Sequence, residues 1–387
     1  MIKKILVFTS SRADYGIMSS LIKKFSRNKN FNLYLIVTGT HLDKSYGYTL
    51  SESESDKVKV KKKIKIKTDI KNSLDIINSS SDLLTKFSKT LKKVKPDVVL
   101  ILGDRYETFV AAISSYILKY PIAHIHGGET TFGSQDEGFR HSITKLSNIH
   151  FVTNKTYYNR VLQLGESPKN IYLVGSLGSE NIKFFKKVKK FQNKKLRFNS
   201  SKKNLLITFH PETMEKDNGR GTFNTLLNFL MKLENYYIIF TSPNADSNTS
   251  HFKKKINYFI KKKKNCSYIR SFGKNNYYSL LKNVDCMIGN SSSGIIETPL
   301  FNLPVINLGN RQKGRVMPKN IINISNNITN KKLKKSLELA LSQNFKKRIK
   351  GIKDPNYKKY TSDNIIKIIK KINFNKFKIK EFHDFRK

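Results

Sequence analysis

The chain has 387 residues, with 74 Lys and Arg against 28 Asp and Glu, so its formal net charge is +46. This length suits about two domains of ordinary size, and a hydrophobic content of 38% excludes a chain that is disordered throughout. A large positive charge is typical of proteins that bind nucleic acids or membrane surfaces, and lysines spread over solvated faces produce the same total. Composition alone does not separate these two interpretations.

The cysteines and the N-terminus indicate the compartment. Cys266 and Cys286 are too few for a disulfide framework, which favours a reducing environment. The apolar run after the first lysines ends at Phe8 and is followed by the polar residues 9–12, so it is too short for a secretory signal. No stretch approaches the roughly 18 apolar residues of a membrane span. We therefore expect a cytoplasmic protein without a membrane partner.

Short apolar runs recur along the chain, separated by segments of helical length. The predicted strands are Ile5–Thr9, Leu33–Thr38, Val98–Leu102, Ile122–Ile125, His150–Thr153, Ile171–Val174, Leu205–Phe209, Tyr237–Thr241, Cys286–Ile288 and Val305–Leu308. Amphipathic helices are predicted at Tyr15–Ser26, Ser79–Val94 and Thr108–Leu118. Continuous apolar strands are buried on both faces, as in parallel sheets covered by helices. The pattern predicts a doubly wound α/β fold.

The domain boundary is predicted from composition. A lysine-rich segment without strands, Lys183 to Lys203, separates a first domain at 1–178 from a second at 200–355. A lysine-rich tail, 356–387, contains a helical pattern that could pack on either domain. Val58–Ile66 alternates between apolar residues and lysines, which predicts a half-buried edge strand whose outward lysines discourage aggregation.

Polar residues follow the predicted strands of the first domain, where open α/β sheets bind ligands. Arg12 begins a helix after the first strand and could bind a phosphate or be solvated. Asp104 and Arg105 follow another strand, either as site residues or as a helix cap with a surface ion pair. His124 and His126 have the spacing of a metal pair, but no nearby Cys or His completes a ligand set, so we predict no metal.

Further charged residues complete the candidate site. Asp136, Arg140 and His141 place acid, cation and base within two helical turns. In the second domain, the turn Gly289–Gly294 offers hydroxyls and backbone amides for a diphosphate, and Glu297 lies one turn further, where it could accept hydrogen bonds from ribose. The chain has neither a Walker sequence nor a GxGxxG fingerprint. This constellation predicts a nucleotide-sugar enzyme with its site in the cleft between the domains.

Seven motifs carry a resemblance to a known family. They are 11–16 (SRADYG), 103–107 (GDRYE), 124–129 (HIHGGE), 140–145 (RHSITK), 209–213 (FHPET), 289–294 (GNSSSG) and 311–315 (RQKGR). In this order, over residues 3 to 318, they resemble the hydrolysing UDP-N-acetylglucosamine 2-epimerases of sialic acid biosynthesis. The resemblance implies two Rossmann-like domains, as in GT-B glycosyltransferases, and no cofactor. It also implies a homo-oligomer, a dimer or a tetramer.

The resemblance implies a reaction as well. UDP-GlcNAc and water would give N-acetylmannosamine and UDP through 2-acetamidoglucal, with a base removing the C2 proton while UDP leaves. Matching the family's motifs, Asp104 and Asp136 would be catalytic carboxylates, His210 would lie near the leaving diphosphate, and Arg140 would orient the acidic cluster. The nucleotide-binding positions would be Arg12, Arg105, Asn244, Ser291, Ser292, Glu297 and Arg311.

One position departs from the family, and three other functions compete. Many relatives carry a catalytic glutamate where this chain has His126. Either His126 takes the acid/base role, or Glu129 does, or Asp104 and Asp136 carry both steps.

The substrate could instead be UDP-2,4-diacetamido-2,4,6-trideoxyglucose or a GDP-linked analogue on the legionaminic acid route. A non-hydrolysing epimerase shares the fold. Only the net charge supports a nucleic-acid-binding protein, so we expect no nucleic-acid partner.

Overall fold

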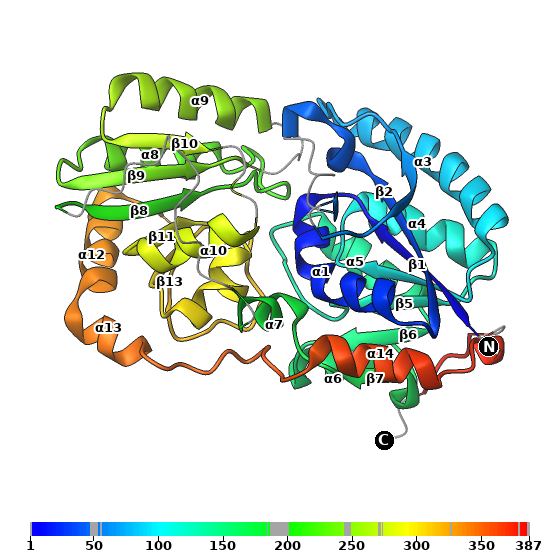
Figure 1. Ribbon diagram of the computed structural model, residues 1–387. Helices are drawn as coiled ribbons and strands as arrows, with labels where there is room; N and C mark the ends of the chain where they lie inside the picture. The colour runs from blue at the N-terminus through cyan, green and yellow to red at the C-terminus, as the bar shows by residue number, and fades with distance from the viewer. Residues whose placement is uncertain are drawn as a thin grey trace. The chain divides into compact units, whose positions relative to one another are not determined.

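The computed structural model describes residues 2–46, 53–54, 56–183, 185, 201–243, 249–269, 272, 274–325, 327–377 and 380–384. The chain forms two compact units (Figure 1). Unit 1 comprises residues 1–129, 136–181 and 356–387, and unit 2 comprises 130–135 and 182–355. The tail therefore belongs to unit 1, and a six-residue segment from the first half of the chain belongs to unit 2.

Unit 1 contains a parallel sheet in the order β3-β2-β1-β4-β5-β6-β7. Its strands are β1 (Lys3–Thr9), β2 (Phe31–Thr38), β3 (Val60–Ile64), β4 (Val98–Leu102), β5 (Ile122–Ile125), β6 (Ile149–Val152) and β7 (Ile171–Leu173). Its helices are α1 (Arg12–Arg27), α3 (Ser73–Val94), α4 (Tyr106–Ile117), α5 (Asp136–Leu146), α6 (Lys155–Gln163) and α14 (Thr361–Lys371), with α7 (Leu177–Lys183) beginning in this unit. Short 3-10 turns lie at Gly39–Leu42, Lys44–Tyr46, Pro168–Asn170 and Phe374–Phe377.

Unit 2 repeats this plan with the order β10-β9-β8-β11-β12-β13, again parallel. Its strands are β8 (Lys203–Thr208), β9 (Tyr236–Thr241), β10 (Cys266–Ile269), β11 (Cys286–Gly289), β12 (Val305–Leu308) and β13 (Ile321–Ile324). Its helices are α8 (Arg220–Met231), α9 (Thr249–Lys262), α10 (Lys274–Asn283), α11 (Ser293–Ile296), α12 (Asn330–Leu341) and α13 (Gln343–Ile349), with a 3-10 turn at Thr298–Phe301. In both sheets the order reverses beside the first strand, which creates a switch point for ligands at the carboxyl ends.

The predicted α/β fold with two doubly wound units is confirmed. The lysine-rich alternation of Val58–Ile66 forms β3 at the edge of its sheet, also as predicted. Sequence analysis missed β10 and β13, which are the two edge strands of unit 2. Three of the four residues in each are partly or fully exposed, so these strands lack the continuous apolar run of a central strand.

The tail helix α14 is a structural part of unit 1. Ile365 and Ile369 are fully buried in the same core cluster as residues of α1. The ammonium of Lys3 donates to the carbonyl oxygens of Ile369 and Ile372 at 2.9 and 2.6 Å, and these carbonyls lie at the end of the helix. A cation there satisfies carbonyls that lack helical partners and complements the helix dipole.

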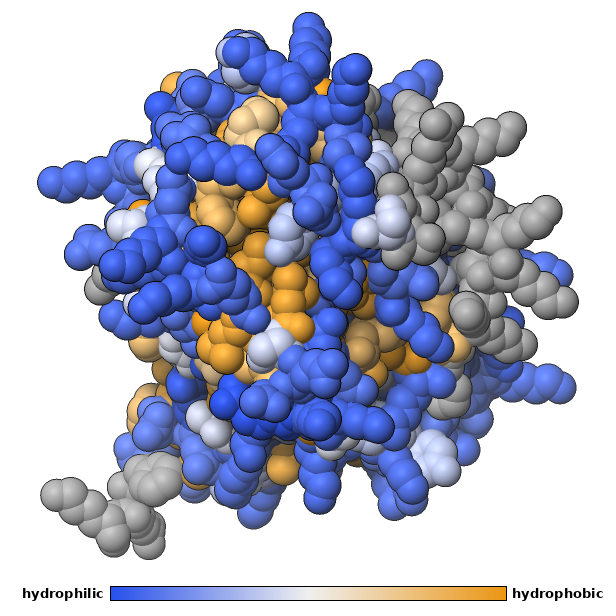
Figure 2. All heavy atoms as spheres, turned by 90° about the vertical axis from the view of Figure 1, so that its left-hand side faces the viewer, coloured by the Kyte–Doolittle hydropathy of each residue, from blue (hydrophilic) through white to orange (hydrophobic). Residues whose placement is uncertain are grey.

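Many of the lysines lie on solvated faces. Helix α12 buries Leu333 and Leu337 and exposes its lysines, which are Lys331, Lys332, Lys334 and Lys335. Figure 2 shows one face of the molecule, most of which is hydrophilic with smaller hydrophobic areas between. Within the described part of the chain, no helix is both long and apolar enough to cross a membrane.

Candidate active site

A buried arginine organises the acidic residues of unit 1. Arg140, on α5, is 1% exposed, and its Nε donates to Asp104 Oδ2 at 3.0 Å. Its Nη2 donates to the same carboxylate, and its Nη1 donates to the Glu137 carboxylate and, at 3.0 Å, to the carbonyl oxygen of Glu129. Burial lowers the pKa of Arg140, but the charges of Asp104, Glu129 and Glu137 outweigh it and raise this pKa above its ordinary value. The guanidinium is therefore a permanent cation in this cluster.

The cluster leaves a carboxylate within reach of a ligand. Asp104 lies two residues after the end of β4, and its side chain is 24% exposed although its partner Arg140 is buried. Glu137 also binds His141, with 3.0 Å between Oε1 and Nε2. Asp136 and Glu137 occupy the first turn of α5, where negative charge is favoured by the helix dipole. The structure thus brings Asp104, Arg140 and Glu137 together. Sequence analysis had not assigned Glu137 to the site.

His126 and Glu129 form a second buried pair after β5. His126 Nδ1 lies 3.2 Å from Glu129 Oε1, and both side chains are less than 10% exposed. An ionised carboxylate only accepts, so this contact requires a proton on Nδ1. Nε2 is buried and has no hydrogen-bond partner among the described residues. Nε2 is therefore the ring nitrogen that takes no part in the pair with Glu129.

The backbone at His126 is unusual. Its φ is +69°, in the left-handed region that costs a non-glycine residue roughly 1–3 kcal/mol and that is common at functional sites. The amide of His126 donates to the carbonyl oxygen of Phe151 at 3.0 Å, which holds this conformation. Gly128 follows with a φ of +77°, and a Cβ there would lie 2.5 Å from the carbonyl oxygen of Tyr157. The close packing explains the glycine and fixes the turn that carries Glu129.

His124 forms hydrogen bonds inside unit 1 through both ring nitrogens and is not placed as a metal ligand. It is fully buried, with Nε2 at 2.8 Å from the carbonyl oxygen of Gly103 and Nδ1 at 3.1 Å from Thr144 Oγ1. Burial lowers the pKa of His124 to about 3, so the ring is neutral. It joins the end of β4 to α5. Across the described parts of both units, no group of three or more His, Cys, Asp or Glu is placed to hold a metal ion.

Two arginines predicted to bind the nucleotide lie near strand ends of unit 1, Arg12 after β1 and Arg105 after β4. Arg12 is the first residue of α1 and is partly exposed, beside the N-cap residue Ser11. Arg105 precedes α4, and its Nε and Nη2 each lie 3.1 Å from an oxygen of Glu107. Glu107 is 1% exposed, so this bidentate pair fixes the orientation of the Arg105 guanidinium. The carboxylate of the preceding residue, Asp104, pairs with Arg140.

In unit 2, an amide joins two strand ends. Asn290 follows β11, and its Oδ1 accepts from the backbone N–H of His210, after β8, at 2.7 Å. Its Nδ2 donates to the carbonyl oxygen of His210 at 2.9 Å and to Glu212 Oε1 at 3.2 Å. Burial, and then the charge of Arg311, lowers the pKa of His210 well below its ordinary value. His210 is therefore a neutral side chain beside a cation.

Glu212 fastens the loop that follows β12. Its Oε2 accepts from the backbone N–H of Asn310 at 3.4 Å. Gly309 has a φ of +73°, and a Cβ at this position would overlap Glu212 Oε1. The loop then places Arg311, whose Nη1 donates to the carbonyl oxygen of Asn290 at 3.4 Å. Three strand ends of unit 2 thus meet through Glu212 and Asn290, and sequence analysis assigned neither residue to the site.

The segment after β11 carries three further predicted nucleotide ligands, Ser291, Ser292 and Glu297. Ser291 Oγ accepts from the backbone N–H of Ser293 at 3.3 Å, and Ser292 is the N-cap of the short helix α11. Ser293 Oγ donates to Glu297, which orients this carboxylate at the end of the helix. Asn244 lies outside the described residues.

The segment 130–135 is attached to the Arg311 loop. Phe132 N donates to the carbonyl oxygen of Lys313 at 3.0 Å. Gly133 packs on the backbone of Asn310, where a Cβ would lie 2.6 Å from the carbonyl oxygen. This segment directly joins Glu129 to Asp136, so the chain between two predicted catalytic residues is part of the unit that carries Arg311.

Comparison with known proteins now decides the family. Residues 23–370 match the UDP-N-acetylglucosamine 2-epimerase family. The chain belongs to this family. The polysialic acid biosynthesis protein P7 of Escherichia coli is a relative that is 35% identical over 385 residues, covering 99% of this chain and 97% of the relative. The GDP/UDP-N,N'-diacetylbacillosamine 2-epimerase (hydrolyzing) of Campylobacter jejuni is 37% identical, covering 83% and 84%.

Solved structures of the epimerase family share the fold. The UDP-GlcNAc 2-epimerase of Neisseria meningitidis, solved with bound UDP-GlcNAc, has a TM-score of 0.79 at 16% identity, over 95% of this chain and 99% of that one. The Methanocaldococcus jannaschii enzyme, in complex with UDP-GlcNAc and UDP, has a TM-score of 0.78 at 20% identity, over 95% and 99%. At these identities the likeness shows the two-unit α/β fold of the epimerases.

Sequence analysis of this epimerase-family chain overlooked the residues that support the site. Glu137 was detectable, because a position three residues before Arg140 faces it on a helix. Glu107 follows Arg105 by two residues, but only the structure shows that it is buried. Glu212 and Asn290 are 78 residues apart, and no local pattern links them.

Proposed function

We propose that this protein is a hydrolysing 2-epimerase that converts UDP-GlcNAc and water to N-acetylmannosamine and UDP. The observation that carries the proposal is the pairing of two polar centres at the ends of adjacent strands. Asp104, held by Arg140, follows β4, and the His126–Glu129 pair follows β5. This supplies a carboxylate and an oriented histidine to a reaction that needs a base and an acid.

The first step removes UDP. His126 Nε2 accepts the proton from C2, the C2–H electrons form the C1–C2 double bond, and the C1–O bond breaks with its electrons leaving on UDP. Glu129 stabilises the imidazolium through Nδ1, since they lie 3.2 Å apart. The product of this step is 2-acetamidoglucal. Arg140 keeps the neighbouring carboxylates oriented, which preorganises the site.

The second step hydrates the glycal. Water adds its hydroxyl to C1 after losing a proton to a carboxylate, for which we propose Asp104 or Asp136. The other of these two residues, in its carboxylic acid form, donates a proton to C2 on the face opposite the one the proton left. The C1–C2 π electrons form the new C2–H bond, which inverts this centre. His126 and the two carboxyl groups then return to their starting protonation states by exchange with water. In unit 2, the cation of Arg311, the neutral His210 and the Ser291–Ser292 turn would bind the diphosphate, and Glu297 the ribose.

A second candidate substrate is the UDP- or GDP-linked 2,4-diacetamido-2,4,6-trideoxyglucose. Two relatives support it: the Campylobacter jejuni protein at 37% identity, and a Legionella pneumophila protein, named UDP-N,N'-diacetylbacillosamine 2-epimerase (hydrolyzing), at 34%. A Neisseria meningitidis relative named UDP-N-acetylglucosamine 2-epimerase is 31% identical. We keep UDP-GlcNAc first, with a role in sialic acid biosynthesis, since the Escherichia coli relative is named for polysialic acid biosynthesis. We also propose a cytoplasmic homo-oligomer.

A proton NMR time course in D2O tests the reaction and the substrate together. The protein is incubated in parallel with UDP-GlcNAc and with the UDP- and GDP-linked diacetamido sugars. Release of N-acetylmannosamine carrying deuterium at C2, together with UDP, supports the proposal. Turnover of only a diacetamido sugar moves the assignment to the second candidate. Retention of the nucleotide on the epimerised sugar, or no turnover of any of the three, refutes a hydrolysing epimerase of this class.

Histidine variants test the base. His126→Ala should lower kcat by roughly 100-fold or more, as expected for loss of a general base, and leave the Kd for UDP unchanged. His251→Ala is the matched control, because His251 lies on α9 in unit 2, outside the proposed site. His126→Glu restores the residue type of many relatives and should recover part of kcat. A wild-type kcat in His126→Ala would move the base to Asp104 or Asp136.

A further inference from the structure

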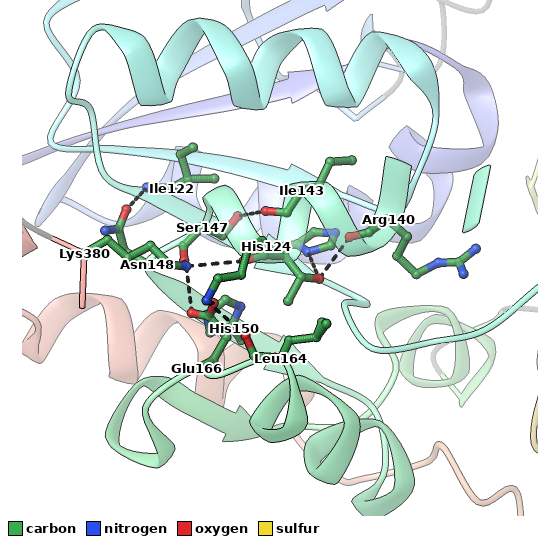
Figure 3. Close-up of polar contacts among 12 residues, drawn as sticks. Ile122, His124, Arg140, Ile143, Ser147, Asn148, His150, Leu164, Glu166 and Lys380 are labelled. Carbon is green, nitrogen blue, oxygen red and sulfur yellow. Dashed lines mark hydrogen bonds and ion pairs between the residues drawn. The ribbon is translucent and has the colours of Figure 1, made fainter. Parts of the chain in front are cut away.

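A buried carboxylate near the end of α5 binds side chains from three parts of unit 1 (Figure 3). Glu166 is 4% exposed and accepts from Lys380 Nζ at 2.7 Å, from Lys145 Nζ at 3.0 Å and from His150 Nε2 at 2.9 Å. Lys145 comes from α5, His150 from β6 and Lys380 from the C-terminal tail. None of these residues belongs to the proposed reaction. We call Glu166 and the tail residues 380–383 the tail latch.

The tail is docked through more than one contact. The backbone N–H of His383 donates to the carbonyl oxygen of Gly165 at 2.9 Å. The ring of Phe382 packs on Gly165 so closely that a Cβ there would overlap it, and the φ of +76° at Gly165 also favours glycine. The ammonium of Lys145 lies 4.6 Å from the centroid of the Phe382 ring, within cation–π distance. The latch is therefore a specific contact between the tail and the loop before β7.

The latch also caps α5. Lys380 Nζ donates to the carbonyl oxygens of Ser147 and, at 3.5 Å, of Thr144, which lie at the C-terminal end of this helix. The Thr144 carbonyl also accepts from the backbone N–H of Ser147 at 3.1 Å. A cation beside the last carbonyls of a helix complements the helix dipole. Lys145, within the same helix, donates to the carbonyl oxygen of Leu164 at 3.0 Å. Two lysines thus hold the end of α5 against the loop of Glu166.

From this end of α5, a continuous set of contacts reaches the proposed site. Thr144 Oγ1 lies 3.1 Å from His124 Nδ1 and 3.0 Å from the carbonyl oxygen of Arg140, one helical turn earlier. The side chain of Arg140 then binds Asp104. In Figure 3, Lys380 and Glu166 lie on one side of His124, and the guanidinium of Arg140 extends away on the other. Movement of α5 along its axis would displace Arg140 relative to Asp104.

Stabilisation of the fold does not by itself explain why these charged side chains are buried. Lys380 has a side chain only 15% exposed, and burial lowers its pKa to about 8 although Glu166 opposes this. Desolvating a buried ion pair offsets much of its attraction, and an apolar pair of similar size is often as stable. An ammonium with fixed carbonyl and carboxylate partners does define the position of a helix end, which an apolar contact does not.

We propose that Lys380 is a positioning residue: by anchoring the tail to Glu166 and to the end of α5, it sets the position of Arg140 and hence of the Asp104 carboxylate. The kinetic part of this inference rests on the proposed function. The structural part, that the tail fixes α5, does not depend on any substrate.

The test compares Lys380→Met and Lys380→Arg with the control Lys376→Met. Lys376 is exposed and lies four residues earlier, outside the latch. Lys380→Met should lower kcat by roughly 10- to 100-fold, as small misplacements of catalytic groups do, with the Kd for UDP within twofold of wild type because unit 2 has no part in the latch. Lys380→Arg keeps a cation and should retain most of kcat. Lys376→Met should match wild type.

Hydrogen exchange provides a readout without substrate. In Lys380→Met, the amides of residues 140–147 should exchange at least tenfold faster than in Lys376→Met, while β8 and β11 stay unchanged. Wild-type kcat and wild-type exchange in Lys380→Met would overturn the proposal, as would equal loss of UDP binding and catalysis. If Lys380→Met does not fold, Glu166→Gln replaces it with the same two outcomes. A wild-type protein without turnover refutes the proposed function, and the exchange result still decides the latch.

Discussion

Acidification should destabilise unit 1 through His124. The ring is fully buried, and burial lowers its pKa to about 3, against an ordinary value of 6.5. The folded state therefore keeps His124 neutral, while the unfolded chain protonates it below pH 6.5. Since the unfolded state then binds more protons, the stability conferred by this residue is fully present above pH 6.5 and is lost as the pH falls toward 3.

The magnitude follows from the size of this shift. Each pKa unit corresponds to about 1.36 kcal/mol, so the whole interval of 3.5 units is worth about 5 kcal/mol, and the part lost between pH 7 and pH 5 is about 2 kcal/mol. His41, His150 and His210 also have lowered pKa values caused first by burial, so a wild-type curve sums several groups. The contribution of His124 must be isolated with a variant.

The assay is urea unfolding at pH 7 and pH 5 for wild type and His124→Asn, followed by far-UV circular dichroism because the chain has no tryptophan. The variant should be less stable at pH 7, since it loses a ring bonded to Gly103 and Thr144. Between pH 7 and pH 5, wild type should lose about 2 kcal/mol more than the variant. Equal losses in both proteins, or a His124 NMR signal that titrates near pH 6.5, would refute the reasoning.

Three further substitutions have defined outcomes. Arg140→Lys replaces a planar fork by a single ammonium that cannot keep both donors on Asp104 Oδ2 and the other partners, so kcat should fall roughly 100-fold. Isothermal titration should show unchanged UDP affinity, and a wild-type kcat would contradict the role given to Arg140. Gly309→Ala forces a Cβ onto Glu212 and should weaken UDP binding at least tenfold with little change in unit 1; unaltered affinity would remove this loop from the nucleotide site. Ile365→Ala empties a fully buried position under α14 and should cost about 2–5 kcal/mol of unfolding free energy in urea; a cost below 1 kcal/mol would mean that α14 is not part of the core.

The central strands were predictable because each is buried on both faces. β1, β4 and β5 in unit 1 are continuous apolar runs, and the covering helices have regular apolar spacing. β10 and β13 were missed for the opposite reason, since an edge strand is half-exposed and its residues are mixed. The placement of α14 in unit 1 was open from its helical pattern, which shows an apolar face but not the surface that it covers.

The residues of the candidate site also fall into two groups, those that a local sequence pattern predicts and those that it does not. Asp104, His126 and His210 were predicted as site residues because each lies within two residues of the end of a predicted strand, and the carboxyl ends of parallel strands are where α/β sheets bind ligands. The Glu129 partner of His126 lies three residues away and belongs to the same motif. Glu212, by contrast, holds Asn310 from 98 residues away, and the Lys380 contact with Glu166 spans 214 residues. No local pattern in the sequence encodes such pairs.

The cations described above occur in two settings. On α12 and β3 the lysines lie on exposed faces. A few cations are instead fixed by tertiary contacts, and Arg140 and Lys380 are the clearest of them. By itself the sequence determined the α/β elements, the strand-end residues and the family resemblance, because these depend on local periodicity and on motifs. Only the tertiary structure decided which charges are buried and paired, because burial depends on residues that are distant in the chain.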